Sequence, residues 1–142
     1  MTMTIHVDIV SAETELYSGL AEMVFVPGKM GELGIAPRHT PLVTTLKPGL
    51  VRLELPENKE ESFFVSGGIL EIQPHVVTIL SDSASRTEDM DEAAVLKAKE
   101  EAEHAFDNIS DDVDFDHVQQ QMIEARAKYE ALQKLRGRSG RS

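Results

Sequence analysis

Apolar residues recur at alternate positions in the first half of the chain and at every third or fourth position in the second half. The alternation predicts short strands, bounded by turn-forming residues, before residue 85. Seven are recognisable, at 4–10, 23–26, 42–46, 51–55, 62–65, 69–72 and 76–80. Because no helical pattern separates them, these strands favour an antiparallel β-sandwich or barrel over a parallel α/β sheet.

A helical period replaces this pattern after residue 85. All six prolines and seven of the nine glycines lie at or before residue 74, so the turn signals stop there. Asp89, followed by Glu92 three residues later, resembles a helix start, and the apolar spacing predicts helices at about 91–106 and 114–136. We therefore expect a sandwich domain over 1–85 and a helical domain over 86–142 that ends in a disordered basic tail.

The two helices should pack against each other as an antiparallel hairpin, because the loop between them is short. The seam of the second helix consists of Phe115, Val118, Met122, Ala125, Tyr129 and Leu132. The first helix offers mainly alanines, which allow close approach but bury little area. We expect a hairpin that is held weakly and can open.

Composition narrows the class of protein. The chain has 142 residues, 41% of them hydrophobic, which suits one compact domain with an appendage. Its formal charge of −11 argues against a nucleic-acid partner. It has no cysteine, which excludes disulfides and thiolate metal sites. Neither a signal peptide nor a membrane-spanning stretch is recognisable, which favours the cytosol.

Charge is distributed unevenly over the helical half. Residues 87–116 carry 12 acidic and 2 basic side chains, whereas residues 117–142 carry 2 acidic and 6 basic ones. Arg126, Lys128, Lys134 and Arg136 place positive charge along the second helix, which suits an acidic protein surface or the first helix. The simpler interpretation is that these residues complement the helix dipole and keep the tail soluble.

The sequence shows no recognisable motif for metal binding, phosphate binding or catalysis. The five histidines show no metal-ligand spacing. The Asp-rich segment fails as a calcium loop, because His117 stands where glycine is needed and Ile123 where glutamate is needed. The glycines at 28–34 lack the P-loop pattern, and those at 67–68 lack a nucleophile elbow. We predict no catalytic residue, no metal and no cofactor.

Four strings of residues are more specific than any periodicity. They are residues 31–42 (GELGIAPRHTPL), 46–49 (LKPG), 64–71 (FVSGGILE) and 77–82 (VTILSD). Together they strongly resemble the epsilon subunit of the bacterial rotary F-type ATP synthase, and the resemblance runs from residue 3 to about residue 135. The order of parts, a sandwich and then two helices, is that of this family.

The resemblance implies a non-catalytic rotor subunit of the central stalk, which binds the gamma subunit and the c-ring and couples proton flow to ATP synthesis. It places the protein at the cytoplasmic face of the bacterial plasma membrane, peripherally. Ser11 and His39 match positions that face gamma, and Glu32 matches one near the ring. The alternative roles are a turn residue for Ser11, a loop hydrogen bond for His39 and a solvated charge for Glu32.

The helices of this family regulate hydrolysis. Folded on the sandwich they are permissive, and extended into the alpha/beta hexamer they block ATP hydrolysis. The resemblance implies that Arg126, Lys128, Lys134 and Arg136 would contact an acidic segment of the catalytic subunits.

Some relatives bind ATP on the hairpin through an Asp-x-x-Arg-Ala motif. Here Asp91 is retained, but Ala94 replaces the arginine, and Glu124 and Lys128 occupy the matching positions of the second helix. Without guanidinium donors, ATP sensing is expected to be weak or absent.

Two other classes of function stay open from the residues alone. An enzyme with a cryptic site in the sandwich is disfavoured by the missing motifs. A stand-alone adaptor that binds acidic partners through its basic second helix would explain the charge reversal, but it leaves the strings at 31–42 and 64–71 unexplained.

Overall fold

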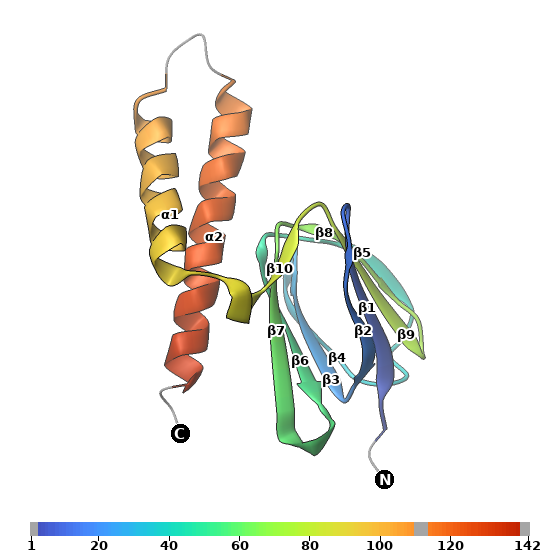
Figure 1. Cartoon of the computed structure of the whole chain (residues 1–142). Coiled ribbons are helices and arrows are strands. Elements are labelled where there is room, and N and C mark those ends of the chain that lie inside the picture. Colours follow the sequence, from blue (N-terminus) through green and yellow to red (C-terminus); the bar gives the residue numbers. More distant parts are fainter. Residues whose placement is uncertain (1–2, 110–113, 140–142) are drawn as a thin grey trace. The chain divides into compact units, whose positions relative to one another are not determined.

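The computed structural model describes residues 3–109 and 114–139. The chain divides into two compact units, Met1–Glu88 and Asp89–Ser142. The first is a β-sandwich and the second is a pair of antiparallel helices, which confirms the fold class predicted from the sequence (Figure 1).

Ten strands build the sandwich. They are β1 (Ile5–Ser11), β2 (Glu15–Ala21), β3 (Met23–Gly28), β4 (Gly31–Ile35), β5 (Leu42–Leu46), β6 (Gly49–Leu55), β7 (Lys59–Val65), β8 (Gly68–Ile72), β9 (Val76–Ser81) and β10 (Ala84–Arg86). Short 3-10 turns lie at η1 (Pro56–Asn58) and η2 (Thr87–Asp89). Three strands, β2, β4 and β10, were not among the seven predicted.

The strands form one sheet in the order β10-β7-β6-β3-β5-β8-β9-β1-β2, with β4 on β3. The join between β3 and β5 is a single residue pair, Gly28 with Leu46, so the sheet can fold over there into two layers. Apolar side chains from both layers fill the space between them, among them Ile9, Leu53 and Phe63, which are fully buried. Each such side chain stabilises the fold by roughly 1.5–3 kcal/mol through burial.

One pairing departs from the predicted antiparallel arrangement. Strands β1 and β9 run parallel, with His6 opposite Val76 and Val10 opposite Leu80. All the other pairings between the described strands are antiparallel. The first strand therefore lies inside the sheet, between β9 and β2.

Gly68, at the start of β8, is required by geometry. Its φ is +136°, and a Cβ there would lie 2.0 Å from the carbonyl oxygen of Leu80. Ser81, which is buried, donates hydrogen bonds to the carbonyl oxygens of Gly67 and Ser83. The Ser-Gly-Gly string is therefore a tight strand junction rather than a nucleophile turn.

The helical unit consists of α1 (Glu92–Asp107) and α2 (Phe115–Ser139). Asp91, rather than the predicted Asp89, caps α1, and its carboxylate accepts a hydrogen bond from the Ala93 amide at 3.1 Å. Helix α2 continues through Gly137, past the predicted end at about residue 136. Most of the expected disordered tail lies outside the described residues.

The seam between the helices matches the expected residues only in part, because Phe115 is 49% exposed and Ala131, which was not expected there, is buried. Val95 of α1 and Val118 and Met122 of α2 are buried. The Phe106 and Phe115 rings, 5.4 Å apart between centroids, join the helices near the connecting loop. Of the described helices, none is long and apolar enough to cross a bilayer.

Candidate interaction surface

Three rows of side chains cross the outer face of the layer made by β2, β1, β9, β8 and β5. Paired residues point to the same face of a sheet, so the pairings define the rows. The apolar row, named for its three apolar members, consists of Val10, Leu80 and Ile69 and ends at Thr45. The polar row consists of Ser18, Asp8, Thr78, Glu71 and Val43. The third row consists of Leu20, His6 and Val76.

Large apolar side chains on this face are open to solvent. Ile69 and Leu80 are cross-strand partners, and each is 49% exposed. Val43 is 66% exposed and Leu20 54%. Exposed apolar side chains gathered on one face of a folded domain are typical of surfaces that bind other molecules, proteins among them.

The hairpin between β3 and β4 borders the apolar row. The Lys29 amide donates a hydrogen bond to the carbonyl oxygen of Thr45 at 3.1 Å, so the tip of the hairpin lies at the β5 end of the row. Met30 at that tip is 97% exposed. Glu32, which follows in β4 opposite Pro27, is exposed as well.

Ser11 and His39 lie at opposite ends of the same layer. Ser11 ends β1, and its hydroxyl donates to the Thr14 carbonyl oxygen at 3.2 Å, which is the turn role considered for it. His39 lies in the loop before β5, with Nδ1 2.7 Å from the Thr40 carbonyl oxygen. That loop is held by a hydrogen bond from the Arg38 amide to the carbonyl oxygen of Pro74, just before β9. The structure therefore does not gather Ser11, Glu32 and His39 into one cluster.

A serine, a histidine and an aspartate meet on the outer face, but they do not form a catalytic triad. His6 Nε2 lies 2.9 Å from Asp8 Oδ1 and 3.1 Å from Ser18 Oγ. Ser18 donates to the same Asp8 oxygen at 2.7 Å. In a triad the carboxylate holds Nδ1 while the hydroxyl meets Nε2. Here both contact Nε2, so nothing activates the serine. Nor do three metal-binding side chains gather anywhere in 3–109 or 114–139.

The edge of the sandwich near its last strand carries a separate hollow of about 340 Å³. Arg86 donates hydrogen bonds there to Glu61 at 3.3 Å and to the Leu16 carbonyl oxygen at 2.7 Å. Burial raises the pKa of Tyr17 in this hollow, the Glu61 carboxylate adds to the rise, and Arg86 partly offsets it. These contacts fix the end of the sandwich where the chain leaves for α1.

Arg126 and Arg136, from the predicted basic set, form ion pairs within the hairpin. Arg126 Nη2 lies 2.8 Å from Glu103, and Arg136 Nη1 lies 2.8 Å from Glu92. Hydrogen bonds from Arg126 and then Lys99 hold the pKa of the Glu103 carboxyl below its ordinary value. Lys134 is exposed, and Lys128 is half-buried.

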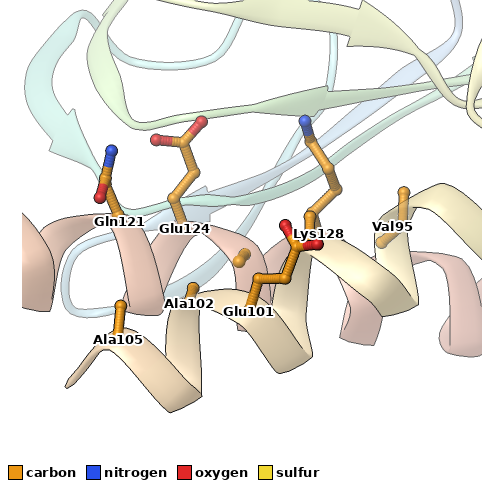
Figure 2. A pocket seen from close by; sticks show the side chains of 9 residues that line it. Val95, Glu101, Ala102, Ala105, Gln121, Glu124 and Lys128 are labelled. Carbon is orange, nitrogen blue, oxygen red and sulfur yellow. The ribbon is translucent and has the colours of Figure 1, made fainter. Parts of the chain in front are cut away.

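A groove of about 430 Å³ runs between α1 and α2 (Figure 2). It is lined by Val95, Ala98, Glu101, Ala102, Ala105, Gln121, Glu124, Ala125 and Lys128. The alanines leave it unfilled, and its charged groups are two carboxylates against one ammonium. Ala94 is exposed on the first turn of α1, after the capping Asp91. A groove with this charge does not favour a polyphosphate.

Sequence reasoning missed the apolar row. A signal was present, because β8 and β9 read as nearly continuous apolar runs rather than as strict alternation. Such runs place apolar side chains on both faces of a strand. Only one face of each strand is covered by the core, so the apolar side chains of the other face stay exposed.

The fold and this surface define a two-unit protein, in which a sandwich presents an apolar face of the kind that binds proteins and a helical hairpin follows. The family model of the ATP synthase delta/epsilon chain β-sandwich domain matches residues 4–87, and that of its long α-helix domain matches residues 88–133. The chain belongs to the ATP synthase delta/epsilon chain family.

Its curated relatives are ATP synthase epsilon chains. That of Nitrosococcus oceani is 54% identical over 140 residues, covering 99% of this chain and 100% of the relative. That of Alkalilimnicola ehrlichii is 49% identical over 138 residues, covering 97% and 99%.

Solved structures share the fold. A chain of the Euglena gracilis mitochondrial ATP synthase, in an assembly of OSCP, F1 and c-ring, superposes with a TM-score of 0.74 at 21% identity, covering 96% of this chain and 81% of that one. A chain of the Tetrahymena thermophila mitochondrial ATP synthase central stalk and c-ring gives a TM-score of 0.60 at 13% identity, covering 94% and 97%.

Proposed function

We propose that this chain is a non-catalytic rotor component of the F-type ATP synthase, which docks on the gamma subunit through the apolar row and couples proton flow to ATP synthesis. The observation that carries the proposal is the exposed pair Ile69 and Leu80 on an otherwise well-packed sandwich. Burying such a pair against a partner gives a stable junction through which torque can pass.

The other residues that we expect to contact partner subunits lie at the ends of the same layer. Ser11 follows Val10 of the apolar row, and His39 lies near the start of β9. In this proposal both contact the gamma subunit, at opposite borders of the interface. Glu32, which lies near the exposed Met30, contacts the c-ring in this proposal. The wide spacing of these residues suits a broad interface rather than a single pocket.

The helical unit acts as a brake on ATP hydrolysis in this proposal. In the closed hairpin, Arg126 and Arg136 are paired with Glu103 and Glu92. When the helices extend into the alpha/beta hexamer, these arginines, with Lys128 and Lys134, exchange their partners for acidic groups of the catalytic subunits. The unfilled groove between α1 and α2 supports an exchange at small cost.

The proposed location is the cytoplasmic face of the bacterial plasma membrane, where the chain is held peripherally through the complex. Bacterial relatives at 49–54% identity support this location.

A truncation after Glu88 tests the proposal. It keeps Arg86 and Thr87, whose side chains hydrogen-bond to the sandwich, and removes both helices. Reconstituted with a catalytic complex that lacks this chain, the truncated form is expected to assemble while ATP hydrolysis rises. Failure to assemble would contradict the rotor role, and unchanged hydrolysis would contradict the brake.

The charges of the brake can be tested separately. Replacing Arg126, Lys128, Lys134 and Arg136 with alanine should relieve inhibition without loss of assembly. Lys97→Ala removes a basic side chain from the exposed part of α1 and is the matched control. Inhibition that survives the fourfold substitution would show that these charges do not carry the brake.

A further inference from the structure

Two carboxylates stand on either side of Thr78 in the polar row. Glu71 of β8 pairs with Thr78, and Asp8 of β1 pairs with Thr78 from the other side. Their Cα atoms are therefore two interstrand spacings apart, about 9.6 Å. The apolar row runs about 7 Å away, two residues further along each strand, so a protein that covers the apolar row also covers these carboxylates.

Each carboxylate is oriented through one of its oxygens. Ser18 donates to Oδ1 of Asp8, and His6 Nε2 contacts the same atom. Gln73 Nε2 donates to Oε1 of Glu71 at 3.2 Å. Oδ2 of Asp8 and Oε2 of Glu71 keep their capacity to accept hydrogen bonds. Within 3–109 and 114–139, no lysine or arginine lies within ion-pair distance of either side chain.

Covering two carboxylates that have no lysine or arginine partner is costly unless the binding protein supplies positive charge. Two carboxylates alone are too few ligands for a firm metal site, and no cluster of three metal-binding side chains lies among the described residues. A second copy of this chain would bring the same acidic row and a formal charge of −11. A long basic side chain that lies across Thr78 can reach both carboxylates.

We propose that Asp8 and Glu71 form a two-carboxylate clamp that selects a protein partner with an arginine or lysine beside its apolar contact ridge. The proposal rests on the proposed docking through the apolar row. It gives the clamp a role in the choice and orientation of the partner, because an apolar ridge that lacks the cation would bury the two carboxylates unpaired.

Binding of the full-length chain to a gamma-containing alpha/beta complex depleted of this subunit provides the test. The variant Asp8→Asn/Glu71→Gln keeps the oxygens that accept the bonds from Ser18 and Gln73, so the face keeps its shape. We expect its affinity to fall by about ten- to a hundredfold, mostly through faster dissociation. Its dependence on salt concentration should also become flatter than that of the wild type.

Two controls separate the clamp from the docking face. Glu57→Gln removes an exposed carboxylate from the η1 turn and should leave binding unchanged. Ile69→Ser/Leu80→Ser should abolish binding. If the serine variant loses binding while Asp8→Asn/Glu71→Gln binds like Glu57→Gln at every salt concentration, the clamp is wrong and the docking face stands. If the serine variant binds normally, the proposed docking face is itself wrong, and the clamp falls with it.

Discussion

Arg126 of α2 grips Glu103 of α1 with two nitrogens, because Nε and Nη2 both lie 2.8 Å from the same carboxylate oxygen. Lys99, one turn before Glu103 on α1, holds the other oxygen at 3.2 Å. The Lys99 ammonium also lies 5.1 Å from the centre of the Tyr129 ring on α2. This chain of contacts joins the two helices across a seam that alanines fill poorly.

Glu103→Gln should therefore loosen the hairpin. The expected result is a modest loss of thermal stability of the helices, seen in their circular dichroism. The difference from the wild type should shrink as salt is raised from about 0.05 to about 0.5 M, since exposed ion pairs are screened. Glu100→Gln, on the exposed part of α1, is the control and should melt like the wild type. Equal melting of the two variants would contradict a role for the pair.

The same pair predicts a dependence on pH. The pKa of Glu103 is lowered from 4.5 in the folded chain, first by the bond from Arg126 and then by the bond from Lys99. Because this pKa is lower in the folded chain, the ionised carboxylate stabilises the hairpin at every pH above the pKa of the unfolded chain. The stabilisation is lost as pH falls through the pKa of the folded chain. The Glu103→Gln variant should lack this pH-dependent stabilisation of the helices. The difference between wild type and variant, measured by melting, should be constant near neutrality, shrink as pH falls below 4.5, and be lost as pH falls through the lowered pKa of the folded chain.

Gly68→Ala should destabilise the sandwich severely. The new Cβ would meet the Leu80 carbonyl oxygen at 2.0 Å, and the φ of +136° is unfavourable for any residue with a side chain. Gly31 has a similar φ of +134° but open space around it, so Gly31→Ala isolates the backbone cost, about 1–3 kcal/mol. Denaturant unfolding should show a clearly larger loss for Gly68→Ala. Equal losses of unfolding free energy in the two variants would mean that the strand junction can shift to make room for the added carbon.

The isolated protein should bind ATP weakly or not at all in isothermal titration. The groove between the helices presents Glu101 and Glu124 to a ligand, with Lys128 as its one cation. Ala94→Arg/Glu124→Arg/Lys128→Arg supplies guanidinium donors and should raise the affinity for ATP. Micromolar binding by the wild type would contradict this prediction.

The fold class was predictable because the two halves differ in period. Strand β2 was missed because its inward positions include Gly19, which reads as a turn signal in a sequence. In the structure a Cβ at Gly19 would lie 3.0 Å from the Tyr17 hydroxyl, so the ring occupies that space. Strand β4, with glycines at 31 and 34, was missed for the same reason. The parallel pairing of β1 with β9 joins segments far apart in the chain, and no local pattern encodes it.

The candidate surface was predictable only in part. The motif residues Ser11, Glu32 and His39 came from a resemblance, and the structure places them at three different borders of the sandwich. The apolar row depends on the register between β8 and β9, which sets Ile69 against Leu80. The pairing of Arg126 with Glu103 depends on how the helices align, and composition showed only the opposite signs of the two segments.

The position of β1 inside the sheet sets the timing of folding during synthesis. His6 pairs with Val76, which leaves the ribosome about 70 residues later, several seconds at usual elongation rates. Until then the first strand can pair on one edge only, with β2. A nascent chain that stalls before residue 76 has emerged should therefore be a target for chaperones or proteases, whereas one from which the start of α1 has emerged can already close the sandwich.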